Sequence, residues 1–257
     1  MRLRLGCGTM PLNANIKYPE KKFTMDDDNL RDALYCLGNE PKLLKNVPVS
    51  VSLVDEFISG IVGPRSSVLG LVRSLLIQAV ALHSYDELKI VLIVNKDELA
   101  EWEYAKWFPH IWDNEKSIRF LSTDTEEVKE LAGILEKNIL SIRSEQANSD
   151  ISYLPYYLII AANRELALKC EAFNKLLAYK ENCGFSIITL YDDIKNIPKE
   201  TVSVIDLNGS EARIYDKDDL SGKSQTFTPD CASLAIANRM AESVANIPLD
   251  ISEQRFS

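Results

Sequence analysis

The sequence predicts an α/β protein with a mostly parallel sheet, helices on both faces of that sheet and a small β-rich extension at the N-terminus. After position 48, short β-branched apolar runs alternate with longer helical patterns, which is typical of parallel strands joined by helices. With 257 residues, 46% of them apolar, the chain can bury a core of ordinary size. We therefore assign residues 1–48 to the extension and residues 49–257 to the main domain.

The N-terminal extension differs from the rest of the chain in its short, interrupted pattern. Alternating segments at residues 3–5 and 16–18 are separated by glycine and proline, which predicts two short strands. A helix is expected over residues 28–37, and it ends at Gly38. The extension should pack on the main domain.

The main domain repeats a strand-then-helix order. Strands are expected over residues 49–54, 57–62, 88–94, 118–121, 156–161 and 185–190. Helices are expected over residues 67–82, 98–107, 125–143, 164–180 and 230–244. Asp124 and Glu127 have the spacing of a helix-capping pair.

Two turns or loops complete the predicted main domain. The pair Asn208-Gly209 between residues 202–207 and 213–215 predicts a hairpin. Residues 144–152 are polar and predict an exposed loop.

Composition excludes several function classes. The chain has 29 Lys and Arg against 38 Asp and Glu, a net charge of −9, which opposes a nucleic-acid-binding face. Its longest apolar runs are far shorter than the ~20 residues of a membrane helix, so we expect no direct membrane insertion. Five cysteines without a Cys-x-x-Cys pair, and two separate histidines, predict a cytosolic chain without a disulfide framework or metal site.

Residues 57–76 have the framework of a phosphate-binding loop, with a strand, a small-residue turn and a long apolar helix. In the pattern Gly-x-x-x-x-Gly-Lys-Ser/Thr, the second glycine lets backbone amides close around phosphate, and the lysine neutralises it. With Gly60 as the first glycine, Arg65 replaces the second and Ser66 replaces the lysine. Of these last three motif positions, only Ser67 agrees with the pattern, because it supplies the hydroxyl of the final Ser/Thr.

This altered loop, which also contains Gly63, predicts a structural turn without a bound nucleotide. Arg65 is expected to be fixed by a hydrogen bond to Ser67 or Asp55, because a charged donor prefers anionic or multiple oxygen acceptors. A second Gly-Lys-Ser, at residues 222–224, lies in a charged stretch with no predicted strand before it, and we interpret it as an exposed loop.

The acidic partners of a phosphate loop are also replaced. An active site of this type needs two carboxylates at the end of a buried strand, an Asp that holds magnesium and a Glu that polarises the attacking water. Here the strand over residues 156–161 is followed by Ala162 and Asn163, and Glu165 is expected to face solvent. An unrelated α/β enzyme could use the adjacent pair Asp192-Asp193, but loop pairs of this kind are usually solvated.

All three tryptophans lie within residues 101–112. Such density indicates either a satellite core or a contact surface, and core is favoured because large aromatic rings are usually buried. His110, beside Pro109, is more typical of a hydrogen-bonded loop histidine than of a catalyst. The candidate residues for partner binding are Trp102, Lys106, Trp107, His110, Trp112 and Arg73.

Several segments together resemble the FtsK/SpoIIIE-type ATPases of bacterial type VII (ESX/WXG100) secretion, the EssC/EccC type. The match is closest to the degenerate, membrane-proximal ATPase-like domain of that family. It depends on the order and spacing of the segments, which are residues 60–65, 72–78, 82–84, 102–110, 154–157 and 184–198.

The resemblance implies a RecA-like P-loop NTPase-type fold in a membrane-anchored, hexameric motor that secretes WXG100-like proteins. It implies a place at the cytoplasmic face of the bacterial cell membrane. The partners it implies are the membrane stalk and neighbouring ATPase modules of the same protein and other secretion subunits. Because the phosphate-loop and strand-end residues depart from the active pattern, we expect a pseudo-ATPase domain without cofactor that couples or assembles the motor. The alternative is an active ATP-binding FtsK-like ATPase or DNA translocase domain.

Overall fold

A computed structural model describes residues 1–18, 29–40, 42–141 and 154–247. Its strands are β1 (Arg2–Pro11), β2 (Leu43–Ser52), β3 (Ile58–Val62), β4 (Leu88–Ile93), β5 (Leu121–Ser122), β6 (Tyr156–Ala161), β7 (Phe185–Leu190), β8 (Ser203–Asp206), β9 (Ala212–Asp216) and β10 (Gln225–Pro229). Its α-helices are α1 (Asn29–Asn39), α2 (Arg65–Leu82), α3 (Leu99–Trp102), α4 (Thr125–Leu135), α6 (Arg164–Lys169), α7 (Glu171–Leu177) and α8 (Leu234–Val244). Short 3-10 turns are η1 (Lys96–Glu98), η2 (Glu103–Trp107), η3 (Pro109–Ile111) and η5 (Ile194–Asn196), and η4 (Glu136–Ser141) is a π-helical turn.

The ten strands form one mixed sheet in the order β2-β1-β10-β9-β8-β3-β7-β6-β4-β5. All pairs from β8 to β5 are parallel, whereas all pairs from β2 to β8 are antiparallel. The parallel part carries the helices and confirms the predicted α/β fold class. The carboxyl ends of β3, β6 and β7 meet at one edge, where a ligand site of such a sheet is expected.

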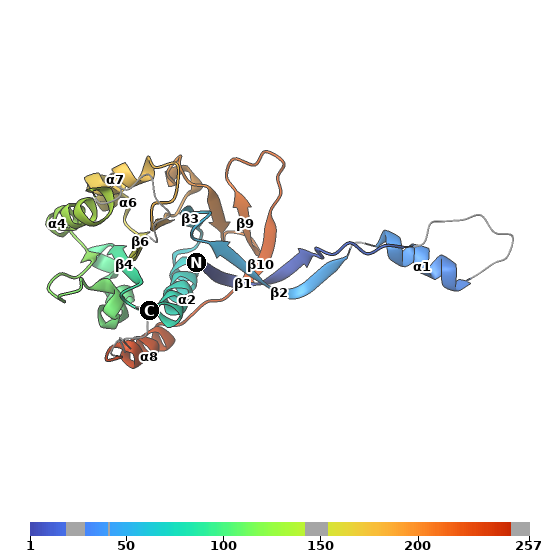
Figure 1. The fold of residues 1–257 in the computed structure, drawn as a ribbon, viewed down its shortest axis with the longest axis horizontal. Coiled ribbons are helices and arrows are strands. Elements are labelled where there is room, and N and C mark those ends of the chain that lie inside the picture. The colour runs from blue at the N-terminus through green and yellow to red at the C-terminus, as the bar shows by residue number, and fades with distance from the viewer. Residues whose placement is uncertain (19–28, 41, 142–153, 248–257) are drawn as a thin grey trace, which may run out of the picture.

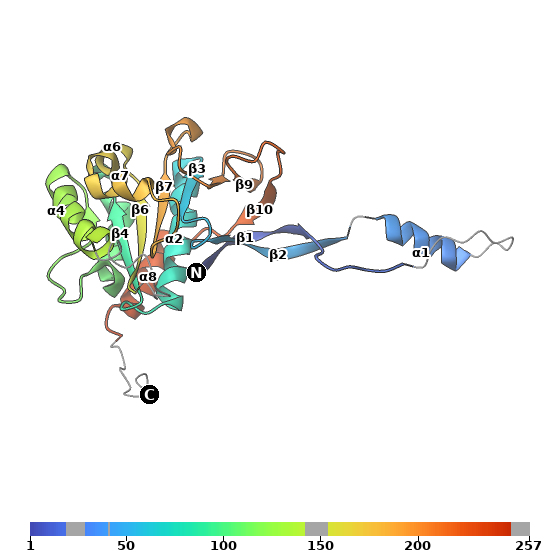
Figure 2. The same cartoon turned by 45° about the horizontal axis from the view of Figure 1, so that its top comes forward.

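Helices cover both faces of the parallel part (Figure 2). Side chains of β4 alternate between the faces, so Ile90 and Leu92 join a core with α2 and α8. Val91 and Ile93 join a second core with α4, α6 and α7. Burial on both faces explains why these strands are continuous apolar runs in the sequence.

Helix α2 packs at the centre of the first core. Within the described residues it alone is long and apolar enough to cross a membrane by length and composition, with a mean hydropathy of 1.4. In the fold, 56% of it is buried, and core helices of folded domains pass the same test. In this fold α2 is a core helix.

The N-terminal segment is part of the sheet. Strand β1 pairs with both β2 and β10, and β2 runs through position 48 into the main domain. Leu3 and Leu5 are fully buried in the first core. A Cβ atom at Gly6 would lie 1.9 Å from the carbonyl oxygen of Thr228, so the close approach of β10 requires glycine there.

The paired strands β1 and β2 project away from the rest of the sheet as an arm that leads to α1 (Figure 1). Helix α1 has no buried residue. The expected strand at residues 16–18 is absent, and the start expected for the helix at residue 28 lies outside the described residues.

Several predicted elements are shorter or broken in the structure. The helix expected over residues 98–107 is a series of short turns from η1 to η2, and the strand expected over residues 118–121 is reduced to β5. The helix expected over residues 164–180 breaks at Cys170, whose backbone is extended. The last helix begins only at Leu234, because Ser233 caps it by accepting a hydrogen bond from the Ile236 amide.

The hairpin predicted around residues 208–209 is confirmed as β8 and β9. Strand β10 was not predicted, because its sequence is short and polar. The predicted loop at residues 144–152 lies outside the described residues.

Candidate functional site at the ends of β3, β6 and β7

The turn that would hold phosphate is short. Only Gly63 and Pro64 connect β3 to α2. Gly63 has a φ of +144°, and a Cβ atom there would lie 2.7 Å from the Cβ of Leu207, so glycine is required. The amide of Ser67 donates to the Pro64 carbonyl over 2.9 Å. The turn is thus tightly closed on itself.

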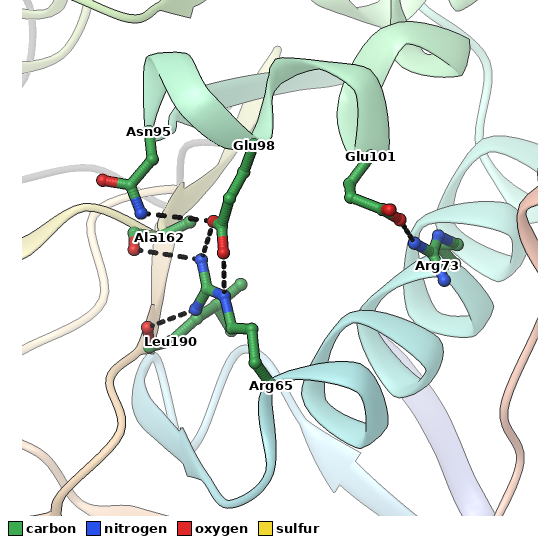
Figure 3. A network of polar contacts seen from close by, with 7 residues as sticks. All are labelled: Arg65, Arg73, Asn95, Glu98, Glu101, Ala162 and Leu190. Atoms are coloured by element: carbon green, nitrogen blue, oxygen red, sulfur yellow. Dashed lines mark hydrogen bonds and ion pairs between the residues drawn. The ribbon is translucent and has the colours of Figure 1, made fainter.

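Arg65, the first residue of α2, extends its guanidinium across the ends of two strands (Figure 3). Its Nε donates to Glu98 Oε1 over 2.8 Å, and its Nη2 forms an ion pair with the other oxygen of Glu98. Its Nη1 donates to the Leu190 carbonyl over 3.0 Å, and Nη2 to the Ala162 carbonyl over 3.4 Å. The guanidinium therefore joins α2, η1, β6 and β7.

The expectation that Ser67 or Asp55 would hold Arg65 was wrong. Asp55 accepts instead from the Ser52 hydroxyl over 2.6 Å. Both expected partners are near Arg65 in sequence, but the side chain of Arg65 leaves the turn and reaches across the strand ends.

An open pocket of about 500 Å³ surrounds this guanidinium. Its charged lining comprises three carboxylates and two guanidiniums, with asparagine side chains between them. The polar lining includes Arg65, Asn95, Glu98, Asn163, Arg164, Glu165 and Asp192. The lining has a net negative charge, which opposes the binding of a polyphosphate.

The end of β6 has no carboxylate in the position next to the strand. Ala162 is buried, and Asn163 caps α6 by accepting a hydrogen bond from the Leu166 amide over 3.1 Å. Glu165 is exposed, as the sequence indicates, although it lines the pocket. Among the described residues, no group of three or more His, Cys, Asp or Glu side chains could hold a metal ion.

The other motifs found in the sequence lie in exposed loops. Asp192 and Asp193 are both exposed, and Asp193 accepts a hydrogen bond from the Lys195 amide over 2.9 Å. The Gly-Lys-Ser at residues 222–224 is exposed in the turn between β9 and β10. A strand, β9, does precede it, contrary to expectation, but the turn joins antiparallel strands and no helix follows.

The aromatic segment divides into a buried and an exposed part. Trp102 is 1% exposed and His110 3% exposed, and both belong to the interior. Trp107 is 50% exposed, and Trp112 is half-buried. Lys106 is partly exposed beside them, with its Nζ 5.6 Å from the centre of the Trp107 ring.

The remaining candidate, Arg73, is buried on α2 two turns after Arg65. It forms an ion pair with Glu101 at the start of the aromatic segment (Figure 3). Arg65 and Arg73 thus hold Glu98 and Glu101, which lie one helical turn apart. The two ion pairs attach the aromatic segment to α2.

Sequence reasoning missed Glu98 and Asn95. Asn95 donates to Glu98 over 3.2 Å and orients the carboxylate toward Arg65. The signal was the spacing of two glutamates directly after a buried strand, opposite two arginines on an apolar helix. Spacing alone does not say which charged residues face one another, because that depends on the strand order.

Ionisation follows these contacts. The hydrogen bond from Arg65 lowers the pKa of Glu98 against the opposing effect of burial, so the carboxylate is charged at neutral pH.

Burial lowers the pKa of His110 to about 4, although its hydrogen bond to the His83 carbonyl raises it. The 2.8 Å contact from Nε2 of neutral His110 to that carbonyl makes Nε2 the donor.

Curated proteins of bacterial ESX secretion align with most of this chain. Over 254 residues it is 24% identical to the ESX secretion system protein EccC of Thermomonospora curvata, an alignment that spans 95% of this chain and 18% of that protein. Over 206 residues it is 23% identical to the ESX secretion system protein YukB of Bacillus subtilis, spanning 80% of this chain and 14% of that protein. These matches support a type VII secretion EssC/EccC-type domain. The resemblance to EssC/EccC-type proteins that was inferred from the sequence is confirmed.

The fold of this chain also has a solved counterpart. The cytoplasmic domain of the type VII secretion ATPase EccC from T. curvata superimposes with a TM-score of 0.57 at 12% identity, over 81% of this chain and 30% of that one. This likeness concerns the fold alone. No family model matches the sequence. The chain spans less than a fifth of the length of these two relatives.

Proposed function

We propose that this chain is a non-catalytic, pseudo-ATPase domain of a type VII secretion motor, and that it couples or assembles the motor rather than hydrolysing ATP. The observation that carries the proposal is the position of the Arg65 guanidinium. The guanidinium lies at the strand ends where an active relative would bind the phosphates and magnesium of a nucleotide, and Glu98 neutralises its charge.

Three further features support a site without nucleotide. A two-residue turn leaves little backbone to surround a phosphate. Ser66 cannot neutralise phosphate as lysine would, and Ala162 and Asn163 cannot hold magnesium as an Asp would. The carboxylates that line the pocket would repel ATP further. We therefore propose that the domain works without ATP or magnesium.

A coupling role follows from what Arg65 connects. Its contacts join β6, β7 and η1, and Arg73 adds a second connection between α2 and the aromatic segment. A displacement at the strand ends would therefore be transmitted to the exposed Trp107 through packed, charged contacts. In this arrangement the Arg65 guanidinium would act as a rigid connection between the strand ends and the aromatic segment.

The setting of the domain is proposed from the relatives. Proteins named for ESX and type VII secretion cover nearly all of this chain, so we place it at the cytoplasmic face of a bacterial cell membrane within a longer, membrane-anchored protein. Its proposed partners are the membrane stalk and ATPase modules of that protein, other secretion subunits, and further copies in a hexamer. The net charge of −9 argues against nucleic acid as a partner.

The test is release of phosphate from ATP by the purified chain with magnesium. We expect a rate equal to that of a heat-inactivated sample. Turnover of about 1 s⁻¹ or more, in the range of ordinary enzymes, would instead identify an active ATPase domain. Stimulation of that turnover by duplex DNA, with a steep loss at higher salt, would identify a DNA translocase.

A further inference from the structure

The turn between β9 and β10 presents an apolar side chain to solvent. Leu220 is 101% exposed, and the exposed Asp218 and Asp219 precede it. The turn is preformed, because Asp219 accepts hydrogen bonds from the amide and hydroxyl of Ser221 over 2.8 and 2.6 Å. Lys217 points back to the body, where its Nζ donates to the Pro198 carbonyl over 3.0 Å. The tip therefore projects a leucine beside two carboxylates.

A pocket of complementary character lies beside the end of α8. It has a volume of about 440 Å³, and its main lining residues are Lys106, Trp107, Pro109, Trp112, Lys116 and Arg119. The Arg119 guanidinium lies 4.5 Å from the centre of the Trp112 ring, so these two lining side chains pack against each other. Two tryptophans and three cations in one concave site form the kind of pocket that anchors an apolar residue flanked by carboxylates.

The turn cannot enter the pocket of its own chain. Strands β8, β3, β7 and β6 separate β9 from β4, a span of roughly 24 Å at the usual strand spacing. Figures 1 and 2 both show the β9–β10 hairpin and α8 well apart. A turn that fits the pocket must come from another molecule.

We propose that the turn at residues 218–220 docks into the Trp107–Trp112 pocket of a second copy of this chain. Leu220 would lie between the two tryptophan rings, with Asp218 and Asp219 facing Lys116 and Arg119. The two surfaces are different parts of the molecule, so the contact is head-to-tail and builds a ring or a filament instead of a closed pair. This inference deepens the assembly role proposed above and rests on it.

Charge exchange across the contact provides the test. One variant carries Asp218→Lys and Asp219→Lys, and a second carries Lys116→Glu and Arg119→Glu. Sedimentation velocity over a concentration series should show self-association of the unaltered chain, weakened at least about tenfold in each variant alone. An equimolar mixture of the two variants should regain association, because each altered turn then meets an oppositely charged pocket. Circular dichroism of each variant controls for folding.

A photo-crosslinker at position 220 provides a readout that does not depend on high affinity. Crosslinks from that position to residues 106–119 of another molecule are expected. An unaltered chain that is monomeric at every concentration and yields no crosslink would overturn the proposal, and so would crosslinks to a different surface. Neither outcome bears on ATP turnover, so failure of this contact is distinguishable from failure of the pseudo-ATPase assignment.

Discussion

Two arginines on the same helix, two turns apart, form similar ion pairs in different surroundings. The Arg65 side chain is one-quarter exposed and binds Glu98 together with the carbonyl oxygens of two strand ends. The Arg73 side chain is 10% exposed and binds Glu101, and its Nε has no partner among the described residues. Arg65 thus satisfies polar groups at the strand ends, whereas Arg73 is held mainly by packing.

The difference indicates where the molecule is rigid and where it is open. The segment beside Arg73 continues into buried aromatic side chains, and the segment beside Arg65 borders an open pocket. Stability should therefore depend most on the buried aromatic rings that follow Glu101, whereas of the two ion pairs the one made by Arg65 should matter more.

The largest effect is expected from the buried end of the aromatic segment. Trp102→Ala should lower the free energy of unfolding by ~3–5 kcal/mol, because it leaves a large cavity in the core. Trp107→Ala is the matched control, and it should cost less than about 1 kcal/mol because its ring is half-exposed. Urea denaturation measures both. Equal losses would show that the two rings share one core.

The next effect comes from pH. His110 is buried and its pKa of about 4 lies below the ordinary 6.5, so the unfolded chain binds a proton there more readily than the folded chain. Stability from this group is complete above pH 6.5 and is lost as the pH falls to about 4, on the order of 3 kcal/mol in total. Lys89 and His83 beside it oppose the extra positive charge, while Asp86 favours it.

A comparison with His110→Gln isolates this titration. The amide of glutamine can still donate to the His83 carbonyl but does not titrate. The difference in unfolding free energy between the two proteins should change between pH 6.5 and 4. A constant difference across that range would show that the imidazole is accessible to water.

Replacement of each arginine by methionine compares the two ion pairs directly. Arg65→Met should cost about 2 kcal/mol, because Glu98 and two strand-end carbonyls lose a charged donor. Arg73→Met should change stability by less than about 1 kcal/mol, because methionine fills the same space and Glu101 can be hydrated. Thermal unfolding of both variants measures the order, and the reverse order would contradict the contrast drawn above.

The parallel part of the fold was predictable because each buried strand is a continuous apolar run. The run at residues 88–94 is β-branched and bounded by charge, which predicts a strand covered on both faces, and β4 has that position. The antiparallel part was less predictable. Strand β10 is half-polar, and the path of β2 across position 48 depends on its pairing with β1, which no local pattern encodes.

The residue types at the strand ends could be identified from the sequence, but the contacts that they make could not. The replaced residues at 65, 66, 162 and 163 can be identified from the sequence. The partner of Arg65 could not, because Glu98 lies 33 residues away and approaches only after β3, β7, β6 and β4 align. Likewise, the division of the tryptophans into buried Trp102 and exposed Trp107 depends on tertiary packing against α8.

Titration calorimetry with ATP and magnesium tests the proposed absence of nucleotide binding most directly. The unaltered chain should give no binding heat at micromolar nucleotide. The double variant Arg65→Gly and Ser66→Lys should show at most weak affinity, because the strand-end acids are still missing. Micromolar binding by the unaltered chain, with Arg65 displaced from Glu98 in a structure of that complex, would contradict the account.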